Sequence, residues 1–469
     1  MSDFNTNLSG QNLYENTNAD RPTSKGAESK ERTKNPISEN GYNNEQSAST
    51  ASYSKGASRP LFTKEMRRTH TILAPQMSPI HFELLEAVFR YSGYNFVILN
   101  NTEPKTVDVG LKYVNNDACY PAIIVVGQMI EALQSGRYDL DRVALAITQT
   151  GGGCRATNYI GFIRRALNDA GFSKIPVIAI SAQGFEKNPG FKLSVPLLIR
   201  LARAMCLGDL LMRVVYRTRP YEAESGSVNA LHKKYAERIK AELKFLSGRK
   251  YRRVIKDLVH DFDTIPLRSV HKPRVGVVGE ILVKFHPTAN NNIVETIEAE
   301  GAECVMPDLL DFMFYSLYNG HVRHTLLGAP KQKARNSDIS IWVLERFRAP
   351  IKKALKKSKR FTPPSSIYDL VKGVDGIVQT GNIMGEGWFL TAEMVELIKA
   401  GVPNIACIQP FACLPNHVTG KGMIKELRRR YPDANISAID YDPGASEVNQ
   451  LNRLKLLLAS AKPGSHPDD

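Results

Sequence analysis

Short, continuous apolar runs alternate with longer helical stretches along most of this sequence, and no other feature constrains the fold as much. The runs include residues 96–99, 143–148 and 176–181. The stretches between them, such as 121–134 and 156–170, space their apolar residues three or four apart, as helices do. Continuous apolar strands separated by helices are typical of parallel sheets covered on both faces. The sequence therefore predicts an α/β fold built from doubly wound parallel sheets.

Two series of strands indicate two lobes. The first series opens near Leu61 with a strand at 69–74, and the second follows a segment at 265–273 that contains Pro and His. The strands expected in the second series lie at 274–279, 376–380, 405–408 and 436–440. A last helix is expected to be capped by Asp442, to hold Pro443 in its first turn and to run through Leu458. We expect an N-terminal lobe at 61–268 and a C-terminal lobe at 269–469, although no sequence repeat aligns them.

Residues 1–60 differ from the rest of the chain. They hold nineteen Asn and Ser, few large apolar residues and no periodicity. Such a segment cannot bury enough surface to offset the entropy of ordering. We predict a disordered polar tail.

The net charge of +15 belongs to the folded part, because the tail carries equal numbers of basic and acidic residues. The densest basic run, residues 346–360, has the spacing of an amphipathic helix, and we interpret it as a solvated helix face. A nucleic-acid-binding protein is an alternative that rests on this charge alone. The first thirty residues contain no signal-peptide core, and no apolar run reaches the roughly 20 residues of a membrane span. We expect a cytoplasmic protein without a membrane partner, whose cysteines stay reduced or bind metal.

Three of the six cysteines lie in segments typical of loops. Cys119 precedes Tyr-Pro, Cys154 follows three glycines, and Cys413 precedes Leu-Pro. Cys154 and Cys413 each come shortly after a predicted strand, and loops at the carboxyl ends of parallel strands line the crevice where α/β folds bind ligands. A tight turn with a free thiol is the alternative for Cys154.

The other three cysteines have the surroundings of core thiols. Cys206 lies in a helical pattern and Cys304 in an apolar strand. Cys407 lies in a predicted strand six residues before Cys413, so a buried position is favoured and a fourth ligand is the alternative. The spacing of the cysteines is weak evidence for metal by itself, since no Cys-x-x-Cys pair is present.

The cysteine segments nevertheless resemble the cluster-binding segments of the 2-hydroxyacyl-CoA dehydratase family. The similar stretches are 115–121 (NNDACYP), 148–155 (TQTGGGCR) and 409–417 (QPFACLPNH), with further similarity at 381–387 and 440–446. The resemblance extends from about Thr69 to Ala461 and is greatest to the dehydratase-like C-terminal parts of large activase-related proteins.

The resemblance implies a 4Fe-4S cluster held by Cys119, Cys154 and Cys413, with one iron open to substrate or to a non-protein ligand. It also implies radical chemistry: an ATP-driven activator protein injects one low-potential electron, and a ketyl radical of a CoA thioester then expels the neighbouring hydroxyl group. The chain would be a lyase or a subunit of one, of the kind used in anaerobic metabolism. Its partners would be the activator, an acyl-CoA substrate, and a second dehydratase-like subunit or a second copy.

A non-catalytic scaffold or electron-relay subunit with the same cluster is the alternative function, because a second subunit and an activator domain are not encoded here. The substrate and the fourth iron ligand stay open. Several polar residues lie in loops or at strand ends within reach of a ligand, but turn and cap roles are more common at such positions, so none is assigned to catalysis: Asn116, Gln149, Glu280, Lys284, Asn382, Glu386 and His417.

Overall fold

The structure is a computed structural model that describes residues 59–461, apart from residue 102 and residues 150–152 and 182–185. The described residues belong to one compact unit. All but the last two residues of the predicted tail lie outside the described range. The boundary expected between residues 268 and 269 stays a prediction, although the strands before and after it form separate sheets.

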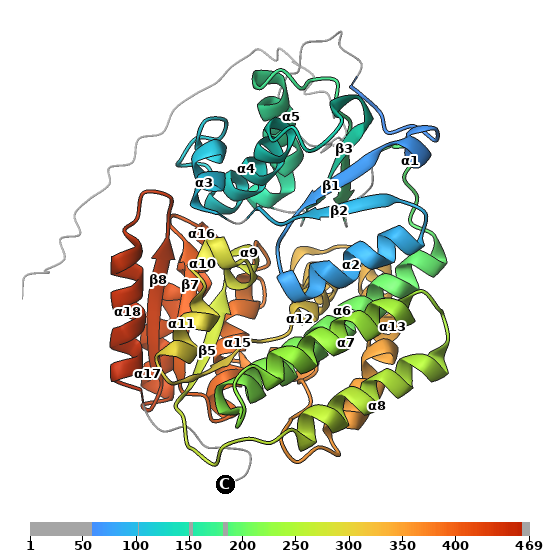
Figure 1. Ribbon diagram of the computed structural model, residues 1–469. Helices are drawn as coiled ribbons and strands as arrows, with labels where there is room; N and C mark the ends of the chain where they lie inside the picture. Colours follow the sequence, from blue (N-terminus) through green and yellow to red (C-terminus); the bar gives the residue numbers. More distant parts are fainter. Residues whose placement is uncertain (1–58, 102, 150–152, 182–185, 462–469) are drawn as a thin grey trace, which may run out of the picture. The chain divides into compact units, whose positions relative to one another are not determined.

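Four parallel strands form the first sheet, in the order β2-β1-β3-β4 (Figure 1). Their bounds are β1 Thr71–Pro75, β2 Asn95–Leu99, β3 Val143–Gln149 and β4 Val177–Ser181. The first five residues of β3 are buried in succession, as expected for a strand covered on both faces.

The second sheet has the corresponding order, β6-β5-β7-β8, and is also entirely parallel. Its strands are β5 Arg274–Gly279, β6 Glu303–Val305, β7 Asn404–Pro410 and β8 Asn435–Tyr441. Every residue of β5 and β7 is buried. The prediction of an α/β fold with two parallel sheets is confirmed.

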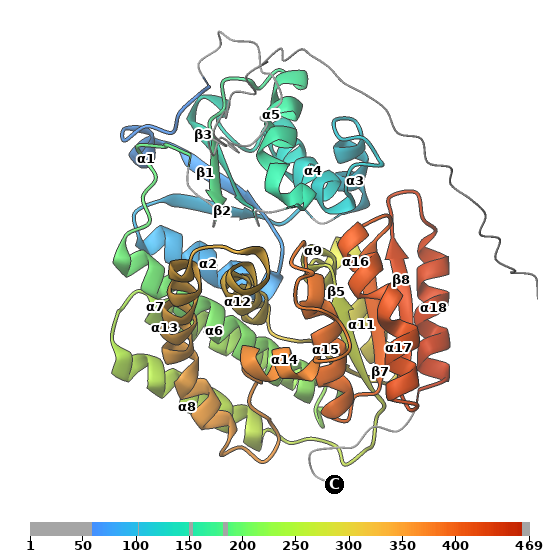
Figure 2. The same cartoon turned by 180° about the vertical axis from the view of Figure 1, so that it is seen from behind.

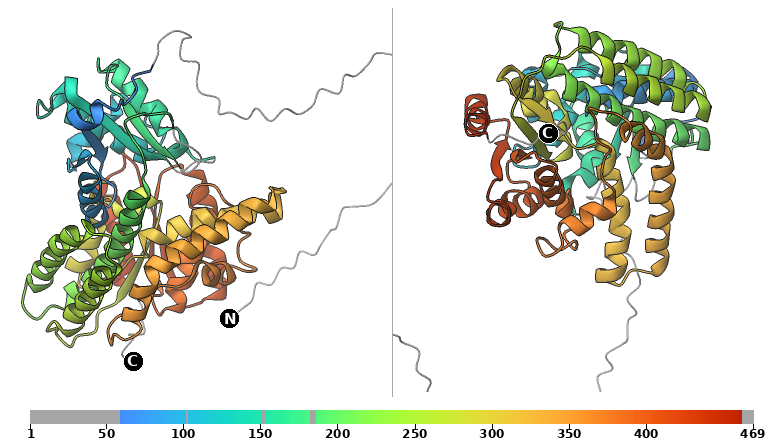
Figure 3. Two further views of the ribbon diagram at one scale, coloured as in Figure 1. Left: turned by 90° about the vertical axis from the view of Figure 1, so that its right-hand side faces the viewer. Right: turned by 90° about the horizontal axis from the view of Figure 1, so that it is seen from below.

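Helices connect and cover the strands, and several are long enough to pack as a layer of their own. In the first half they are α1 Met66–Thr69, α2 Pro79–Tyr91, α3 Pro104–Leu111, α4 Tyr120–Gln134, α5 Tyr159–Asp169, α6 Val195–Thr218, α7 Ser227–Leu243 and α8 Gly248–Thr264. In the second half they are α9 Ile281–Phe285, α10 Pro287–Asn290, α11 Ile293–Ala299, α12 Leu309–Leu327, α13 Lys331–Leu355, α14 Ile367–Gly373, α15 Gly387–Lys399, α16 Leu414–Thr419, α17 Ile424–Arg430 and α18 Glu447–Ala459. Helix α6 packs against α2, α7, α8 and α13, and α12 lies beside α13 (Figures 2 and 3). None of the helices in the described ranges combines the length and apolarity that crossing a membrane requires.

Two details of the sequence prediction are wrong. Residues 376–380 form turns rather than a strand, because Gly376 has a φ of 65° and the N–H groups of Ile377 and Val378 both bond to the carbonyl of Val374. The last helix begins at Glu447 after Ser446, because the carboxylate of Asp442 instead accepts a hydrogen bond from the N–H of Gly444 at 2.7 Å.

The basic run at 346–360 is only in part a solvated face. Lys353, Lys356 and Lys357 are exposed, as expected. Arg348 is only 2% exposed, and it forms ion pairs with Asp308 and Asp311 at 2.8 and 2.7 Å. The interpretation is therefore wrong for Arg348, because two buried carboxylates at the start of α12 draw this side chain into the core.

Candidate functional site

Cys119 is the N-cap residue of α4, one of the most buried helices of the chain. Pro121 lies in the first turn of α4, where the absence of its N–H costs nothing. The thiol faces a second helix start, since the Cys119 Sγ is 3.7 Å from the hydroxyl of Tyr159, the first residue of α5. Nothing in the local sequence signalled this contact with Tyr159.

Cys154 caps a short 3₁₀ helix, Arg155–Asn158, that follows β3 and leads into α5. Its Sγ accepts a hydrogen bond from the N–H of Ala156 at 3.4 Å. The N–H of Gly153 donates to the Sδ of Met384 at 3.0 Å, so a loop of the second half of the chain lies against the Cys154 loop. Two of the three glycines before Cys154 lie outside the described residues.

Cys413 is the N-cap residue of α16, which follows β7. The preceding Ala412 has a φ of 57°, a left-handed conformation that reverses the chain, and the N–H of Cys413 bonds back to the carbonyl of Pro410 at 3.2 Å. The three expected cysteines therefore have the same local setting, because each is the N-cap residue at which a loop leads into a helix.

Two carboxyl groups belong to the same neighbourhood and also stand at helix starts. Glu280 caps α9, and its Oε2 accepts a hydrogen bond from the N–H of Val283 at 2.8 Å. Glu386 precedes α15 and accepts a bond from the N–H of Ile281 at 3.1 Å. With its amide turned to suit both neighbours, Asn416 donates to Glu386 Oε2 at 2.6 Å and accepts from the N–H of Glu280 at 3.0 Å. The starts of α9, α15 and α16 are thus tied together.

The three thiols all lie within electrostatic range of Glu280. Burial raises the pKa of Cys119 to about 11 and that of Cys154 to about 12, and it raises the pKa of Cys413 still further. The negative charge of Glu280 adds to the increase in the pKa of all three thiols. Cys119 acts in the same way on Cys154, and Cys154 acts on Cys413.

The carboxyl pair holds protons to unusually high pH for the same reason. Burial raises the pKa of Glu280 to about 8, with a further contribution from the charge of Glu386. Burial also raises the pKa of Glu386 to about 7, against the effect of the N–H bond from Ile281. The site therefore has a deficit of positive charge, and a metal centre among these groups would favour the thiolates.

Donor spacing limits the kind of metal that could bind. Within the described residues, no three His, Cys, Asp or Glu side chains lie together as a single metal ion would require. The cysteines thus form no zinc-type site. A cubane is different, because its thiolates bind separate iron atoms and stand further apart.

The helix starts supply the positive end of the local field. Helices α4 and α15, of 15 and 13 residues, begin at Cys119 and Glu386. The N-terminus of such a helix carries unsatisfied N–H groups and a partial positive charge that favours anions. In the views of Figures 1 and 2, α9 and α16 lie at the end of the second sheet that faces α4, and α10 contacts α4.

The remaining cysteines are core thiols, as predicted. Cys206 in α6, Cys304 in β6 and Cys407 in β7 are all buried. The charged groups that affect the pKa of Cys407 are Glu393, Asp440 and Lys421, and the carboxyl pair is not among them. Its surroundings give no support to a role as fourth ligand.

The other residues that the sequence left open have varied surroundings. Gln149 donates to the carbonyl of Thr157 at 2.7 Å, and Asn382 donates to the carbonyl of Gln379 at 2.9 Å, so both stabilise turns. Lys284 forms a buried ion pair with Glu393 at 2.8 Å.

Asn116 and His417 complete this group. Asn116 is exposed in the loop before Cys119. The His417 Nε2 lies 3.9 Å from a carboxylate oxygen of Asp440. None of the seven residues left open was assigned a role from the sequence, and of these seven Glu280 and Glu386 are the ones whose charges act on the thiols.

Exposed apolar side chains flank the cysteine loops. Phe411 and Leu414 stand on either side of Cys413 and are 62% and 71% exposed. Val418 is half exposed on α16, and Met384, which contacts Gly153, is 46% exposed. An apolar margin of this kind beside buried polar groups is typical of a surface that a ligand or a protein covers.

Comparison of the chain with protein-family models and with curated proteins gives no match.

Proposed function

We propose that this chain is the iron–sulfur component of a 2-hydroxyacyl-CoA dehydratase-like system, with a 4Fe-4S cluster held by Cys119, Cys154 and Cys413. The observation that carries the proposal is that three thiols from distant helix starts all lie within electrostatic range of one buried carboxyl group, Glu280. The resemblance of the three cysteine segments to that family gives the chemical class.

The donor set fits a cluster with one open iron. Three soft thiolate donors suit iron–sulfur chemistry, and the buried Cys407 has surroundings that do not suit a fourth donor. Such a cluster would supply a low-potential electron and a Lewis-acidic iron at which a carbonyl or hydroxyl oxygen can bind.

The protein's own groups would manage the proton and exclude water. Glu280 and Glu386 carry carboxyl groups that hold a proton near neutral pH, so one of them can give a proton to a departing hydroxide. Asn416 keeps Glu386 oriented through the bond to Oε2. Phe411 and Leu414 offer an apolar surface to an acyl chain.

The same arrangement supports the proposed partners. An apolar margin at the cysteine loops suits coverage by a second dehydratase-like subunit or a second copy of this chain. A separate ATP-driven activator would provide the electron, and the basic excess of the chain suits the phosphates of coenzyme A. We place the protein in the cytoplasm and expect no nucleic-acid or membrane partner.

Anaerobic reconstitution tests the cluster. The wild-type protein should bind about four iron atoms and become brown. Cys119→Ala, Cys154→Ala and Cys413→Ala should each lose most of this iron, whereas Cys304→Ala, a matched core thiol, should retain it. Wild-type iron below about one atom per chain would rule the proposal out.

A second experiment separates the enzyme from the alternative, an electron-relay subunit with the same cluster. The reduced, iron-loaded protein is supplied with an activator and a panel of 2-hydroxyacyl-CoA thioesters. Release of enoyl-CoA supports a lyase. Iron binding without any enoyl product would favour the relay.

A further inference from the structure

A separate cavity of about 450 Å³ is lined mainly by residues of the second half of the chain, together with Arg213 of α6. Its walls come from the second half of α15, the residues between β6 and α12, and the segment that leads into α14. The volume falls in the range of small-molecule sites. None of the three cysteines and neither Glu280 nor Glu386 lines it. Glu386 lies at the other end of α15 from the cavity residue Lys399, and this separation is about 20 Å at the helical rise per residue.

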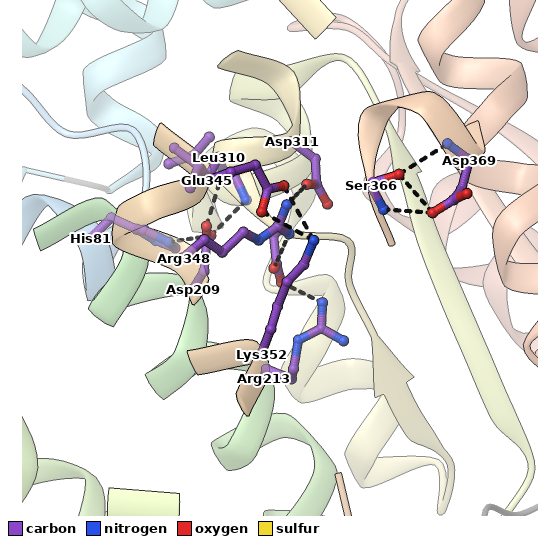
Figure 4. Close-up of polar contacts among 12 residues, drawn as sticks. His81, Asp209, Arg213, Leu310, Asp311, Glu345, Arg348, Lys352, Ser366 and Asp369 are labelled. Carbon is purple, nitrogen blue, oxygen red and sulfur yellow. Dashed lines mark hydrogen bonds and ion pairs between the residues drawn. The ribbon is translucent and has the colours of Figure 1, made fainter. Parts of the chain in front are cut away.

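Arg213 and Asp311 line the cavity and belong to one network of polar contacts (Figure 4). Arg213 donates to Asp308 Oδ1 at 2.7 Å, and Arg348 lies between Asp308 and Asp311, at 2.8 and 2.7 Å from their oxygens. This network fixes both side chains in place. Arg213 still exposes 24% of its side chain and is one of the residues that line the cavity.

The margin of the cavity also carries both signs of charge. Glu396 and Lys399 lie three residues apart in the last turn of α15. Neither side chain forms a hydrogen bond or an ion pair with any described residue. Asp369, which also lines the cavity, is by contrast occupied, because its carboxylate accepts bonds from the N–H and the hydroxyl of Ser366 (Figure 4).

Apolar side chains make up much of the remaining wall. They come from three separate segments and include Val305, Met306, Pro363, Leu370 and Val395. A purely polar ligand would leave these surfaces uncovered, so the lining favours a ligand with an apolar body.

We propose that this cavity binds a zwitterionic small molecule with apolar side chains, up to the size of a dipeptide. Its carboxylate is bound by Arg213 and Lys399, and its ammonium group is bound by Glu396. A singly charged ligand could satisfy one sign of charge among these groups and would meet a like charge in the other. This inference is independent of the iron–sulfur proposal, because it uses none of the same residues.

Three matched probes test the charge rule by calorimetric titration of the full chain. Ala-Leu is a zwitterion, Ala-Leu amide is a cation, and N-acetyl-Ala-Leu is an anion of the same shape. We expect Ala-Leu to bind at least about tenfold more tightly than either relative, which is the effect of one well-placed charge pair. Equal binding of the amide or of the acetylated probe would overturn the proposal, as would no heat from Ala-Leu at millimolar concentration.

Two variants locate the binding. Glu396→Gln should weaken Ala-Leu about tenfold and should not weaken N-acetyl-Ala-Leu, whereas Lys399→Gln should weaken Ala-Leu and should not weaken the amide. Both residues lie at the margin without partners, so neither variant removes a contact of the fold. Asp375→Asn, an exposed acidic residue outside the cavity, is the matched control and should bind as wild type. Wild-type binding of Ala-Leu by both margin variants would show that it binds elsewhere and would overturn the assignment.

Discussion

The two sheets have the same strand order, yet the loops at corresponding places carry different chemistry. In chain order β3 and β7 are the third strands of their sheets, and Cys154 and Cys413 follow them. The helices that lead into these strands begin at Cys119 in the first sheet and at Glu386 in the second. One position is therefore a thiol in both sheets, and the other is a thiol in one and a carboxyl in the other.

A third pair of positions follows the first strand of each sheet. Ser78 caps the helix after β1, and Glu280 caps the helix after β5. The first sheet thus contributes two thiols and a hydroxyl, and the second contributes one thiol and two acids. The fold provides the same three positions twice, with different side chains at the corresponding places.

Removal of the buried charge of Lys284, four residues after Glu280, should have the largest effect on the free energy of unfolding. Lys284→Met leaves Glu393 buried without its partner, and we expect a loss of about 3–5 kcal/mol in the free energy of unfolding. The equivalent helix of the first sheet has no lysine there and instead holds His81 between Ser78 and Asp209.

The double variant Lys284→Met, Glu393→Leu is the control, because it removes both charges and should recover most of the loss. Urea unfolding of the metal-free protein measures both. A single variant within about 1 kcal/mol of wild type would mean that the pair contributes little.

The central strands differ in how far they stay paired. The pairing of β1 with β3 extends only as far as Leu73, whereas the pairing of β5 with β7 extends to Gly279 at the end of the strand. Gly279 has a φ of 156°, and a Cβ added to it would lie 1.8 Å from the carbonyl oxygen of Ile408. Gly279→Ala should therefore cost about 3 kcal/mol or more.

Gly276→Ala, on the same strand, is the matched control for this prediction. Its added methyl group would meet the flexible end of Leu397, which can move, so the loss should be smaller. Similar losses in the two variants would contradict the steric argument.

Glu280 and Glu386 should make the free energy of unfolding depend on pH. A carboxyl whose pKa is raised keeps in the folded chain a proton that the unfolded chain releases. The stability of the metal-free protein should therefore fall as the pH rises from about 5 to about 8. Glu280→Gln should reduce that fall by about 1–2 kcal/mol.

Unfolding measured at several pH values tests this prediction. Ser78→Ala, at the corresponding position of the first sheet, should leave the pH dependence unchanged. A Glu280→Gln protein whose stability falls with pH as steeply as that of wild type would show that the carboxyl does not hold the proton.

The smallest expected effect on stability is that of replacing Cys407, the thiol inside β7 of the second sheet. Cys407→Ala removes one sulfur from a packed core, so we expect a loss of about 1 kcal/mol and no change in iron content after reconstitution. A drop in iron to the level of Cys413→Ala would identify Cys407 as a ligand and would break the equivalence of the two third strands.

Much of the fold could be predicted because strand signals are local. The apolar runs at 143–148 and 405–408 both became central strands, since burial on both faces requires apolar residues in succession. Residues 376–380 have a similar composition but are partly exposed, which a local pattern does not reveal. The burial of Arg348 was missed for the same reason, because its partners lie about forty residues away in the sequence.

The sequence predicted that two of the cysteines follow strands, and it did not reveal the buried acids near them. Cys154 and Cys413 follow strands, so topology alone places them at the carboxyl ends of β3 and β7. Glu280 and Glu386 were noted as loop residues, but their raised pKa values depend on burial and on other acidic groups, Glu386 for Glu280 and Glu393 for Glu386, and these are tertiary effects. An acidic residue between an apolar strand and a helix start was the available signal for Glu280.

One contact between the halves has a consequence for how the molecule opens. The side chain of Gln128 in α4 meets the Nε2 of His286, in the second half of the chain, at 3.1 Å, and both are fully buried. Burial lowers the pKa of His286 to about 4, so the imidazole is uncharged where it contacts Gln128. Any separation that lets water in also lets the ring take up a proton below about pH 6, and acid therefore favours the parted state. Mild acidification should therefore favour separation of α4 from the second sheet.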